Sequence, residues 1–487
     1  MTPPPTRTGH TRSATALLAV LTPAMLATVI ASDMANLMLP AIGERFGASE
    51  AELAWVVTGF LLMFSVGIPF YGRVSDRLSL RHLFGFALAA YAAGSLICAL
   101  APALPPLVLG RIVMGVGAAG LPVLSIIAVT RLMPDHQRGM GIGVVSAATG
   151  IGTAAGPAIG GGIGQALGWP ALFWMMLIVA LALLPAAWRV LPGDRPAGTG
   201  RLDLPGGILL GLGAGLTLYG ITQAQVTGLT APSSWAALLA AAAAFALFAR
   251  RTLRLTDPFV PPTLFTTPAY RAAVAVAFLA MAVNLGAMVL VPLLVVDVNG
   301  LQPGAGALVM IPAGVAVTVL SPLIGRLADR VPTRLLVLSG LAAVGLSSLV
   351  LSTFAGGDSV IPAGLGILGL SVGVFFVLTP IISAAAGALP PHQAGAGLGI
   401  LQGAQFLGAG TGPALLGALV TARQHTGAGA LNPLHAPHDG AAYSDAFLAM
   451  AAIAALALIA ALRLRTAPTP APSGPVPSGP SIPPPPR

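Results

Sequence analysis

The chain has 487 residues, of which 56% are apolar and 8% are charged, and its formal net charge is +9. Soluble globular proteins are about 25% charged, so this composition excludes a soluble enzyme, a nucleic-acid-binding module and a disordered scaffold. A chain this apolar needs lipid as its solvent. All 23 basic residues are arginine, and the single cysteine, Cys98, excludes a disulfide framework.

Apolar runs separated by polar breaks predict an all-α polytopic membrane protein with fourteen spans, each near the roughly 20 residues that a bilayer requires. The predicted spans are residues 14–40, 53–72, 82–100, 105–130, 140–164, 170–190, 205–225, 234–250, 270–296, 305–325, 334–354, 360–388, 396–421 and 444–463. Glycine and alanine dilute the signal of the two spans near 205–250, and a count of twelve is the alternative.

The arginines separate onto one side of this topology. If the N-terminus is cytoplasmic, the outer loops hold Arg45 and Arg423, and the inner loops and tails hold nearly all the others. The inner set includes Arg73, Arg77, Arg81, Arg131, Arg138, Arg189, Arg195, Arg201, Arg250, Arg251, Arg254, Arg271, Arg326, Arg330, Arg334, Arg463 and Arg465. Because positively charged loops stay in the cytoplasm, both termini are predicted there, in a multi-pass protein of the bacterial plasma membrane.

Two motifs recur at nearly one offset. The segment from Gly72 to Arg77 returns 253 residues later as residues 325–330, and the GxxxGP unit at 152–157 returns after 256 residues at 408–413. Two unrelated motifs with nearly one offset predict two homologous six-helix bundles, and parallel repeats of this kind are one known transporter plan. The predicted parts are a cytoplasmic tail (1–13), the first bundle (14–191), a linker with an inserted helix pair (192–268), the second bundle (269–465) and a disordered Pro-rich cytoplasmic tail (466–487).

The loop after the second span carries Gly72, Asp76, Arg77 and Arg81, with Ser79 between them. It resembles the pattern G-x-L-a-D-R-x-G-R-R/K of the major facilitator superfamily, within which the chain resembles the fourteen-helix drug:proton antiporters; Ser79 replaces the second glycine. A carboxylate at a helix end suits the N-terminus of a facing helix and pairs with arginine. The resemblance implies that this loop latches the inner gate, and topological charge alone is the alternative.

The fifth span contains Gly152, Gly156, Pro157, Gly160 and Gly161 in the spacing G-x-x-x-G-P-x-x-G-G. Glycines at this spacing allow close helix contact, and the proline favours a kink. The full pattern resembles the family's antiporter motif, which marks exporters rather than symporters. Helix packing alone is the alternative.

Arg111 lies within the fourth span, where an arginine costs at least about 2.5–3.5 kcal/mol on insertion scales. It therefore needs a use or a partner, and tying helices together is the structural alternative. Its surroundings resemble the family's R-x-x-Q-G-x-G motif, with Met114 in place of the glutamine.

Asp33 and Asn36 lie in the first span, three residues apart and therefore on one helix face. The segment resembles the family's L-D-x-T-x-x-N-x-A-L-P motif when aligned on Asn36, but the family's acid then falls on Ala31. We hypothesise that Asp33 and Arg111 approach across a central cavity, where the acid exchanges a proton or a cationic drug. A polar residue that water reaches near the interface is the alternative for Asp33.

Several other polar residues leave two roles open. Asp297 lies at the outer end of the ninth span. It is either a second titrating acid or an exposed acid of the loop. The amide side chains within spans either line a substrate cavity or bond a neighbouring helix; they are Gln223, Gln225, Asn284, Gln402 and Gln405. No metal site is predicted, and solvated loop residues explain His435, His438 and Asp439.

The resemblance implies a proton-coupled antiporter that exports small amphipathic drugs or antibiotics by alternating access, as a monomer and without nucleic acid. No cofactor is expected besides the proton gradient, since a chain without lysine has no Walker phosphate-binding motif. The few acids within spans favour neutral or singly charged substrates. A dedicated exporter of one natural product is the alternative, and Gly156-Pro157 argues against import. A membrane enzyme is disfavoured because no inner loop holds paired carboxylates or a His/Cys cluster.

Overall fold

The computed structural model describes residues 8–48, 50–193, 203–227, 231–300, 308–354, 356, 359–390, 393–427, 429–435 and 440–464. Within these ranges it describes the backbone alone for residues 8–13, 32–37, 40, 50–51, 54, 149–150, 153–161, 165, 222, 224–227 and 425.

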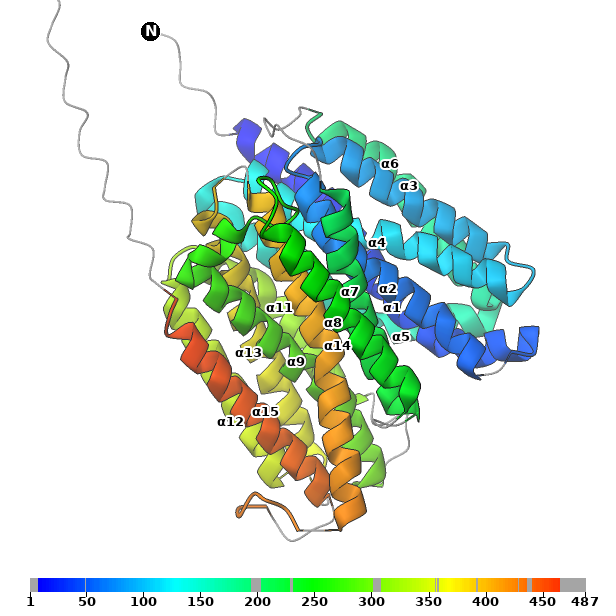
Figure 1. Cartoon of the computed structure of the whole chain (residues 1–487), viewed down its shortest axis with the longest axis vertical. Coiled ribbons are helices and arrows are strands. Elements are labelled where there is room, and N and C mark those ends of the chain that lie inside the picture. Colours follow the sequence, from blue (N-terminus) through cyan, green and yellow to red (C-terminus); the bar gives the residue numbers. More distant parts are fainter. Residues whose placement is uncertain are drawn as a thin grey trace, which may run out of the picture.

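Fourteen long helices fill the described part of the chain (Figure 1). They are α1 (Thr8–Phe46), α2 (Glu50–Val74), α3 (Leu80–Ala99), α4 (Leu104–Leu132), α5 (Asp135–Leu167), α6 (Trp169–Val190), α7 (Leu204–Thr227), α8 (Pro232–Thr252), α9 (Pro268–Asp297), α11 (Ile311–Ala328), α12 (Thr333–Phe354), α13 (Ile361–Ala388), α14 (Ala394–Thr426) and α15 (Ala441–Ala461). A short 3-10 helix, η1 (Pro262–Thr266), precedes α9. Each predicted span corresponds to one of these helices, and the fourteen-helix prediction is confirmed.

Local sequence signals set many of the helix ends. Proline occupies the first or second position of α4, α6, α8, α9, α11 and α13, where its missing N–H is not needed. The side chain of Ser79 accepts a hydrogen bond from the His82 amide and caps α3. Ser79 therefore has a structural use in the place where the family motif has a second glycine. Gly427, with φ of 59°, ends α14 in the left-handed conformation.

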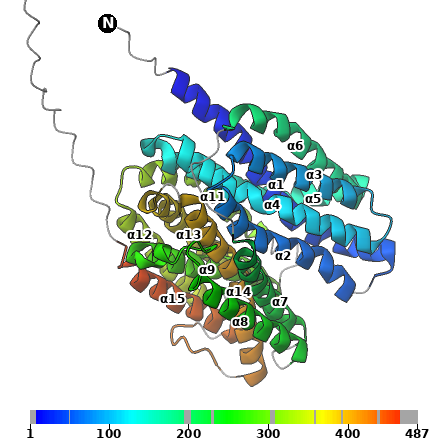
Figure 2. The same ribbon diagram turned by 45° about the horizontal axis from the view of Figure 1, so that its top comes forward.

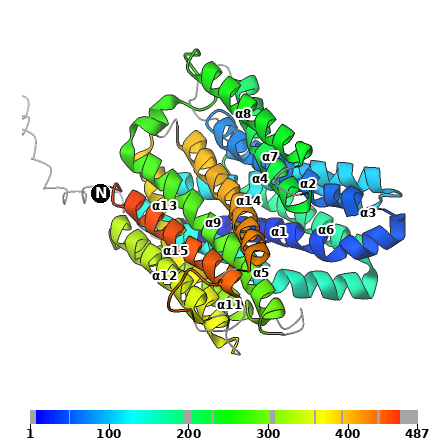
Figure 3. The same ribbon diagram turned by 60° about the horizontal axis from the view of Figure 1, so that its bottom comes forward.

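The helices form two six-helix bundles with an inserted pair. Helices α1–α6 make the N-terminal half, and α9 with α11–α15 makes the C-terminal half. The inserted helices α7 and α8 pack on each other, and α7 also packs against α2 and α14 (Figure 3). The insert therefore covers the seam between α2 and α14.

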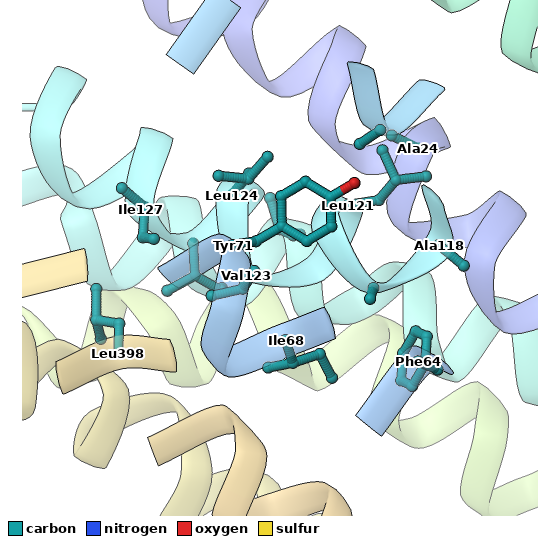
Figure 4. Packing of buried hydrophobic residues seen from close by; sticks show 14 of the residues in the cluster. Ala24, Phe64, Ile68, Tyr71, Ala118, Leu121, Val123, Leu124, Ile127 and Leu398 are labelled. Carbon is teal, nitrogen blue, oxygen red and sulfur yellow. The ribbon is translucent and has the colours of Figure 1, made fainter. Parts of the chain in front are cut away.

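The buried core is shared by both halves at one end of the molecule. We call that end, where residues 73–81, 131–138, 250–271 and 326–334 lie, the arginine-rich side; Figure 2 turns it toward the viewer. One apolar cluster runs from the N-terminal half into this end of α9, α13 and α14. Tyr71 of α2 packs there beside Leu121 and Leu124 of α4, and Leu398 of α14 belongs to the same cluster (Figure 4).

At the opposite end, a second cluster lies within the C-terminal half, around Val283, Leu290 and Phe447. Among the described residues, the two halves thus share a core on the arginine-rich side and have separate cores at the other end. This conformation is closed on the arginine-rich side.

Candidate transport site

Asp76 joins the two halves on the arginine-rich side. Its carboxylate accepts hydrogen bonds from the Gly395 and Ala396 amides, at 2.8 and 2.9 Å, in the first turn of α14. These amides have no partner within the helix, and a carboxylate there is further favoured by the helix dipole. The Arg131 guanidinium donates to the same carboxylate at 2.7 Å. We call these four residues the first carboxylate contact.

Glycines allow the backbones to approach at this contact. A Cβ atom on Gly72 would lie 2.6 Å from the Gly395 carbonyl oxygen and from the Gly399 Cα. Real Cβ atoms essentially never come so near, so α2 and α14 pack this closely because Gly72 carries no side chain. The first glycine of the loop motif is thus explained by a contact between halves.

The second copy of the motif makes a related contact. Asp329, after α11, accepts hydrogen bonds from the Gly139 and Met140 amides in the second turn of α5, at 2.8 and 3.0 Å. A Cβ on Gly139 would lie 2.5 Å from the Gly325 carbonyl oxygen, so this crossing also depends on glycine. These residues form the second carboxylate contact, in which no arginine pairs with Asp329 among the described residues.

Burial controls the electrostatics of both acids. Burial raises the pKa of the Asp76 carboxyl above its usual range, and the Ala396 amide, Arg131 and the Gly395 amide act in the opposite direction. Burial likewise raises the pKa of Asp329 against the Gly139 and Met140 amides. The donors therefore offset only part of the desolvation of each buried carboxylate, and loss of Arg131 would raise the pKa of Asp76 further.

The loop arginines bind the insert instead of Asp76. Arg73 and Arg77 donate to opposite oxygens of Asp257, at 2.7 and 2.6 Å, and Arg73 also donates to the Pro258 carbonyl. Asp257 lies between α8 and η1. Arg81 donates to the Leu191 carbonyl at the end of α6. The predicted gating loop therefore connects three parts of the protein at once.

Substituting Asp257→Asn is expected to lower the free energy of unfolding by about 1–2 kcal/mol, because it leaves the buried Arg73 without its anionic partner. Thermal unfolding of the detergent-solubilised protein measures this change. The matched control is Asp135→Asn, since Asp135 pairs with Arg138 while its side chain is 87% exposed. Equal unfolding temperatures for the two variants would contradict the expectation.

A cavity of 520 Å³ lies between the halves, with the insert forming part of its wall. Its lining comes from α1, α2, α4, α5, α7, α9, α13 and α14. Asn284, Gln402 and Gln405 line this cavity, which is one of the two roles predicted for them. Gln223 instead donates to the Tyr219 hydroxyl at 2.8 Å, and the Gln225 side chain lies outside the described residues. The volume lies in the range of small-molecule sites.

Arg111 is fully buried and ties α4 to its neighbours. It donates to the Val56 carbonyl of α2 and the Ala31 carbonyl of α1, at 3.0 and 3.2 Å, and lies 4.2 Å from the centre of the Phe60 ring. No carboxylate pairs with Arg111 among the described side chains, and those of Asp33 and Asn36 lie outside that set. The described contacts of Arg111 tie helices together, which was the alternative to a role in transport. The predicted approach of Arg111 to Asp33 stays a prediction.

Substituting Arg111→Lys is expected to lower the free energy of unfolding by about 1–3 kcal/mol, because a buried lysine does not reproduce the planar fork that reaches both carbonyls. Thermal unfolding in detergent tests this loss. An unchanged unfolding temperature with impaired transport would instead favour a role for Arg111 in the transport cycle.

Three other predicted groups lie away from the cavity or outside the described set. Asp297 ends α9, where its exposed carboxylate accepts a hydrogen bond from the Tyr443 hydroxyl at 2.5 Å. Gly152 packs against Val29 of α1, whereas Gly156, Pro157, Gly160 and Gly161 lie in the stretch of α5 without described side chains. His435 contacts the Ser352 carbonyl; His438 and Asp439 lie outside the described residues, and within the described ones no metal-binding cluster occurs.

Comparison with known families decides the class. The model of the Major Facilitator Superfamily matches residues 21–413. The chain belongs to the major facilitator superfamily. This facilitator is therefore a multi-pass membrane transporter of small molecules, not an enzyme, and the family predicted from the sequence is confirmed.

Its relatives include resistance proteins. The facilitator is 30% identical to the multidrug resistance protein Stp of Mycobacterium tuberculosis over 80% of this chain and 72% of that protein. It is 26% identical to the lincomycin resistance protein LmrB of Listeria monocytogenes over 80% and 83%. Both relatives match 80% of this chain.

Solved structures share its fold. The human organic anion transporter MFSD10 covers 94% of this facilitator, and all of that chain is matched, with a TM-score of 0.66 and 17% identity. The proton:xylose symporter XylE matches over 92% of this chain and 95% of its own, with a TM-score of 0.65 and 16% identity. At these identities the likeness concerns the fold alone.

Three residues of the site were not identified from the sequence: Arg131, Asp257 and Gly395. Arg131 lies in the last turn of α4 and Asp257 in a loop, where charged residues are common, and their partners lie 55 and 184 residues away in the chain. Gly395 begins a helix in which glycine is frequent, with no local sign of close approach. The repeated loop motif was the one sequence signal for these contacts. The aspartate of each copy bonds to backbone amides of a helix in the other half, so each copy indicates that such a helix lies opposite.

Proposed function

We propose that this facilitator is a proton-coupled antiporter that exports small amphipathic drugs or antibiotics by alternating access. It acts as a monomer in the bacterial plasma membrane, with both termini in the cytoplasm and the proton gradient as its energy source. The observation that carries the proposal is the cavity between the halves, closed on the arginine-rich side by two polar contacts. The names of the Stp and LmrB relatives support export of drugs.

The closing contacts suit a reversible gate. Each places a carboxylate on backbone amides of a helix in the other half, so it breaks without unfolding either bundle. Once the contacts break, the carboxylates and amides exchange their hydrogen bonds for bonds to water. The cavity then becomes accessible from the arginine-rich side.

Asp33 is the leading candidate for proton coupling. The structure describes ten other acidic residues, and each lies outside the helices or within a few residues of a helix end. Asp33 instead lies in the interior of α1. Intramembrane acids are costly and commonly mark proton relays.

Everted membrane vesicles from an efflux-deficient bacterium test the proposal. Candidate drugs and dyes are added one at a time to energised vesicles, and dissipation of the pH gradient is followed for the wild type and for Asp33→Asn. Substrate-evoked proton release in the wild type alone supports antiport coupled through Asp33. Equal release in both supports antiport with coupling elsewhere, where Asp297 is tested next. Release with a single compound favours the dedicated exporter, and no release with any compound contradicts the proposal.

A further inference from the structure

We infer that the inserted helix pair is a lateral wall of the cavity, which moves with the N-terminal half and slides on α14. The inference rests on the proposed alternating access and assigns the insert, residues 203–259, a part in it. Helix α7 packs against both α2 and α14 (Figure 3), and its Leu218 and Tyr219 line the cavity. Alternating access moves one half against the other as a rigid body. An element that contacts both halves then follows the half that holds it more firmly.

The insert is held together as one unit by Asp203, which precedes α7. Its buried carboxylate accepts hydrogen bonds from the Gly206 amide in the first turn of α7, from Arg251 at the end of α8 and from the Phe259 amide, at 3.0, 2.7 and 3.2 Å. Helices α7 and α8 also pack along each other. Both ends of the insert are therefore bonded to one side chain, and the insert moves as one body.

One face of α2 contacts the insert along most of the helix. The contacting residues are spaced by three, four or seven positions, which places them on one side of α2. They are Trp55, Leu62, Val66, Phe70 and Arg73. Trp55 stacks on Tyr219 with ring centroids 5.9 Å apart, and Phe70 packs against Phe259 with centroids 5.6 Å apart. Both are favourable separations for aromatic pairs, so the rings fix the insert to α2 near both ends of that helix.

Between the two ring pairs, glycines of α7 accommodate side chains of α2. A Cβ atom on Gly211 would lie 3.0 Å from the Val66 Cβ, and one on Gly215 would lie 3.5 Å from the Leu62 Cγ. Small residues let two helices approach closely in this way. The interlocking contacts resist a displacement of α7 along α2.

Ion pairs hold the insert at its arginine-rich end. The Asp257 carboxylate accepts from Arg73 with one oxygen and from Arg77 with the other. The Arg73 side chain is 6% exposed, so its charge-assisted bond is largely shielded from water. These bonds are directional, and they join the insert to the N-terminal half alone.

The contacts of the insert with the C-terminal half are of another kind. Leu218 of α7 packs on Gly410 of α14, and no ion pair joins the insert to that half within the described ranges. A leucine on a glycine has no directional bond to break, and packed helices slide by small steps. Beyond the insert, Thr263 of η1 donates to the Gln393 side chain before α14, at 3.4 Å. Residues 260–267 are therefore the link between the two bodies.

Distances between spin labels test which half the insert follows. Pairs of cysteines are introduced in the Cys98→Ala full-length protein, labelled, and measured by pulsed electron paramagnetic resonance in detergent. The labels replace Leu100 after α3, Trp235 in α8 and Ile361 in α13, which are exposed at the end opposite the arginine-rich side. They mark the N-terminal half, the insert and the C-terminal half.

The gate is perturbed by Gly72→Val, whose side chain would hold α2 and α14 apart on the arginine-rich side. We expect this variant to shift the α3–α13 and α8–α13 distances together and to leave the α8–α3 distance unchanged. Gly387→Val is the matched control, because an added Cβ there meets no atom within 4 Å. A shifted α8–α3 distance overturns the inference, whether or not the α8–α13 distance also shifts.

Two cysteine pairs of matched geometry give a second test. Leu62→Cys with Gly215→Cys joins α2 to α7, and Leu218→Cys with Gly410→Cys joins α7 to α14. In both pairs, a Cβ on the glycine would lie 3.5 Å from the leucine Cγ, the position that a cysteine Sγ takes, which is within reach of a disulfide. The disulfide yield is measured by maleimide labelling of the remaining thiols after denaturation. We expect Gly72→Val to lower the α7–α14 yield severalfold and to leave the α2–α7 yield unchanged; the reverse result, or equal losses, overturns the inference.

The outcomes separate this inference from the proposed function, because neither measurement needs a substrate. Absence of substrate-evoked proton release with the expected distances contradicts proton-coupled export and leaves the inference standing. A change between α8 and α3 overturns the inference alone. An α3–α13 distance that shifts neither with Gly72→Val nor with Asp76→Asn removes the movement on which both depend, and overturns both.

Discussion

Substituting Gly72→Val is expected to reduce export at least about tenfold, because the arginine-rich side can no longer close. The added Cβ would lie 2.6 Å from backbone atoms of Gly395 and Gly399, and backbone cannot rotate away as a flexible side chain does. Overpacking of this kind typically costs about 1–3 kcal/mol, and about 1.4 kcal/mol is tenfold in an equilibrium. The added volume acts against the closed conformation and not against the open one.

The position of the gate is measured directly with a reporter cysteine. Ser146 lines the cavity, so Ser146→Cys in a Cys98→Ala background reports access from the arginine-rich side to a membrane-impermeant maleimide. Labelling is expected to rise with Gly72→Val. The matched control is Gly387→Val near the end of α13, where an added Cβ meets no atom within 4 Å. Low export with unchanged labelling would contradict the gating explanation and favour misfolding.

The helices were predictable from the sequence because lipid makes their signal simple. A spanning segment satisfies its backbone internally and exposes apolar side chains, so each apolar run marks a helix. The observed helices often extend beyond the apolar runs: α1 covers Thr8–Phe46 where residues 14–40 were predicted. Polar residues outside the apolar run continue the helix, and hydropathy carries no signal for such turns.

The sites were only partly predictable, because their partners are chosen by packing. The carboxylate of Asp76 was expected at the N-terminus of a facing helix, and a helix N-terminus is a position that many sequences supply. The partners of Arg111 are backbone carbonyls, which every residue provides, so no sequence pattern marks them. For Asn284 and Gln405, the sequence placed each residue within a membrane-spanning helix. It did not indicate which neighbouring helix packs against that side of the helix.

The same substitution, aspartate to asparagine, is expected to reduce export by different amounts at the two carboxylate contacts. Asp76 is 3% exposed and paired with Arg131, whereas Asp329 is less buried and bonds to backbone amides alone. Substituting Asp76→Asn leaves Arg131 without its anion, and breaking a buried pair typically costs about 3–5 kcal/mol. The substitution Asp329→Asn keeps one acceptor oxygen for the Gly139 and Met140 amides, and the loss of one hydrogen bond typically costs about 1 kcal/mol. We expect Asp76→Asn to abolish export and Asp329→Asn to reduce it several-fold.

A double-mutant cycle with Arg131→Met identifies the cause. If Asp76 acts through its pair with Arg131, the double variant is expected to transport no worse than Asp76→Asn alone, because residues in one network are not additive. Drug-evoked proton release in vesicles measures all four proteins, and Asp135→Asn controls for loss of an exposed acid on the same side. Two outcomes would contradict this explanation: losses of transport that add up in the double variant, or equal losses for Asp76→Asn and Asp329→Asn. Either would mean that the negative charge of Asp76 acts independently of Arg131. The unequal contacts would then be a feature of packing, and the repeat would function as two equivalent gates.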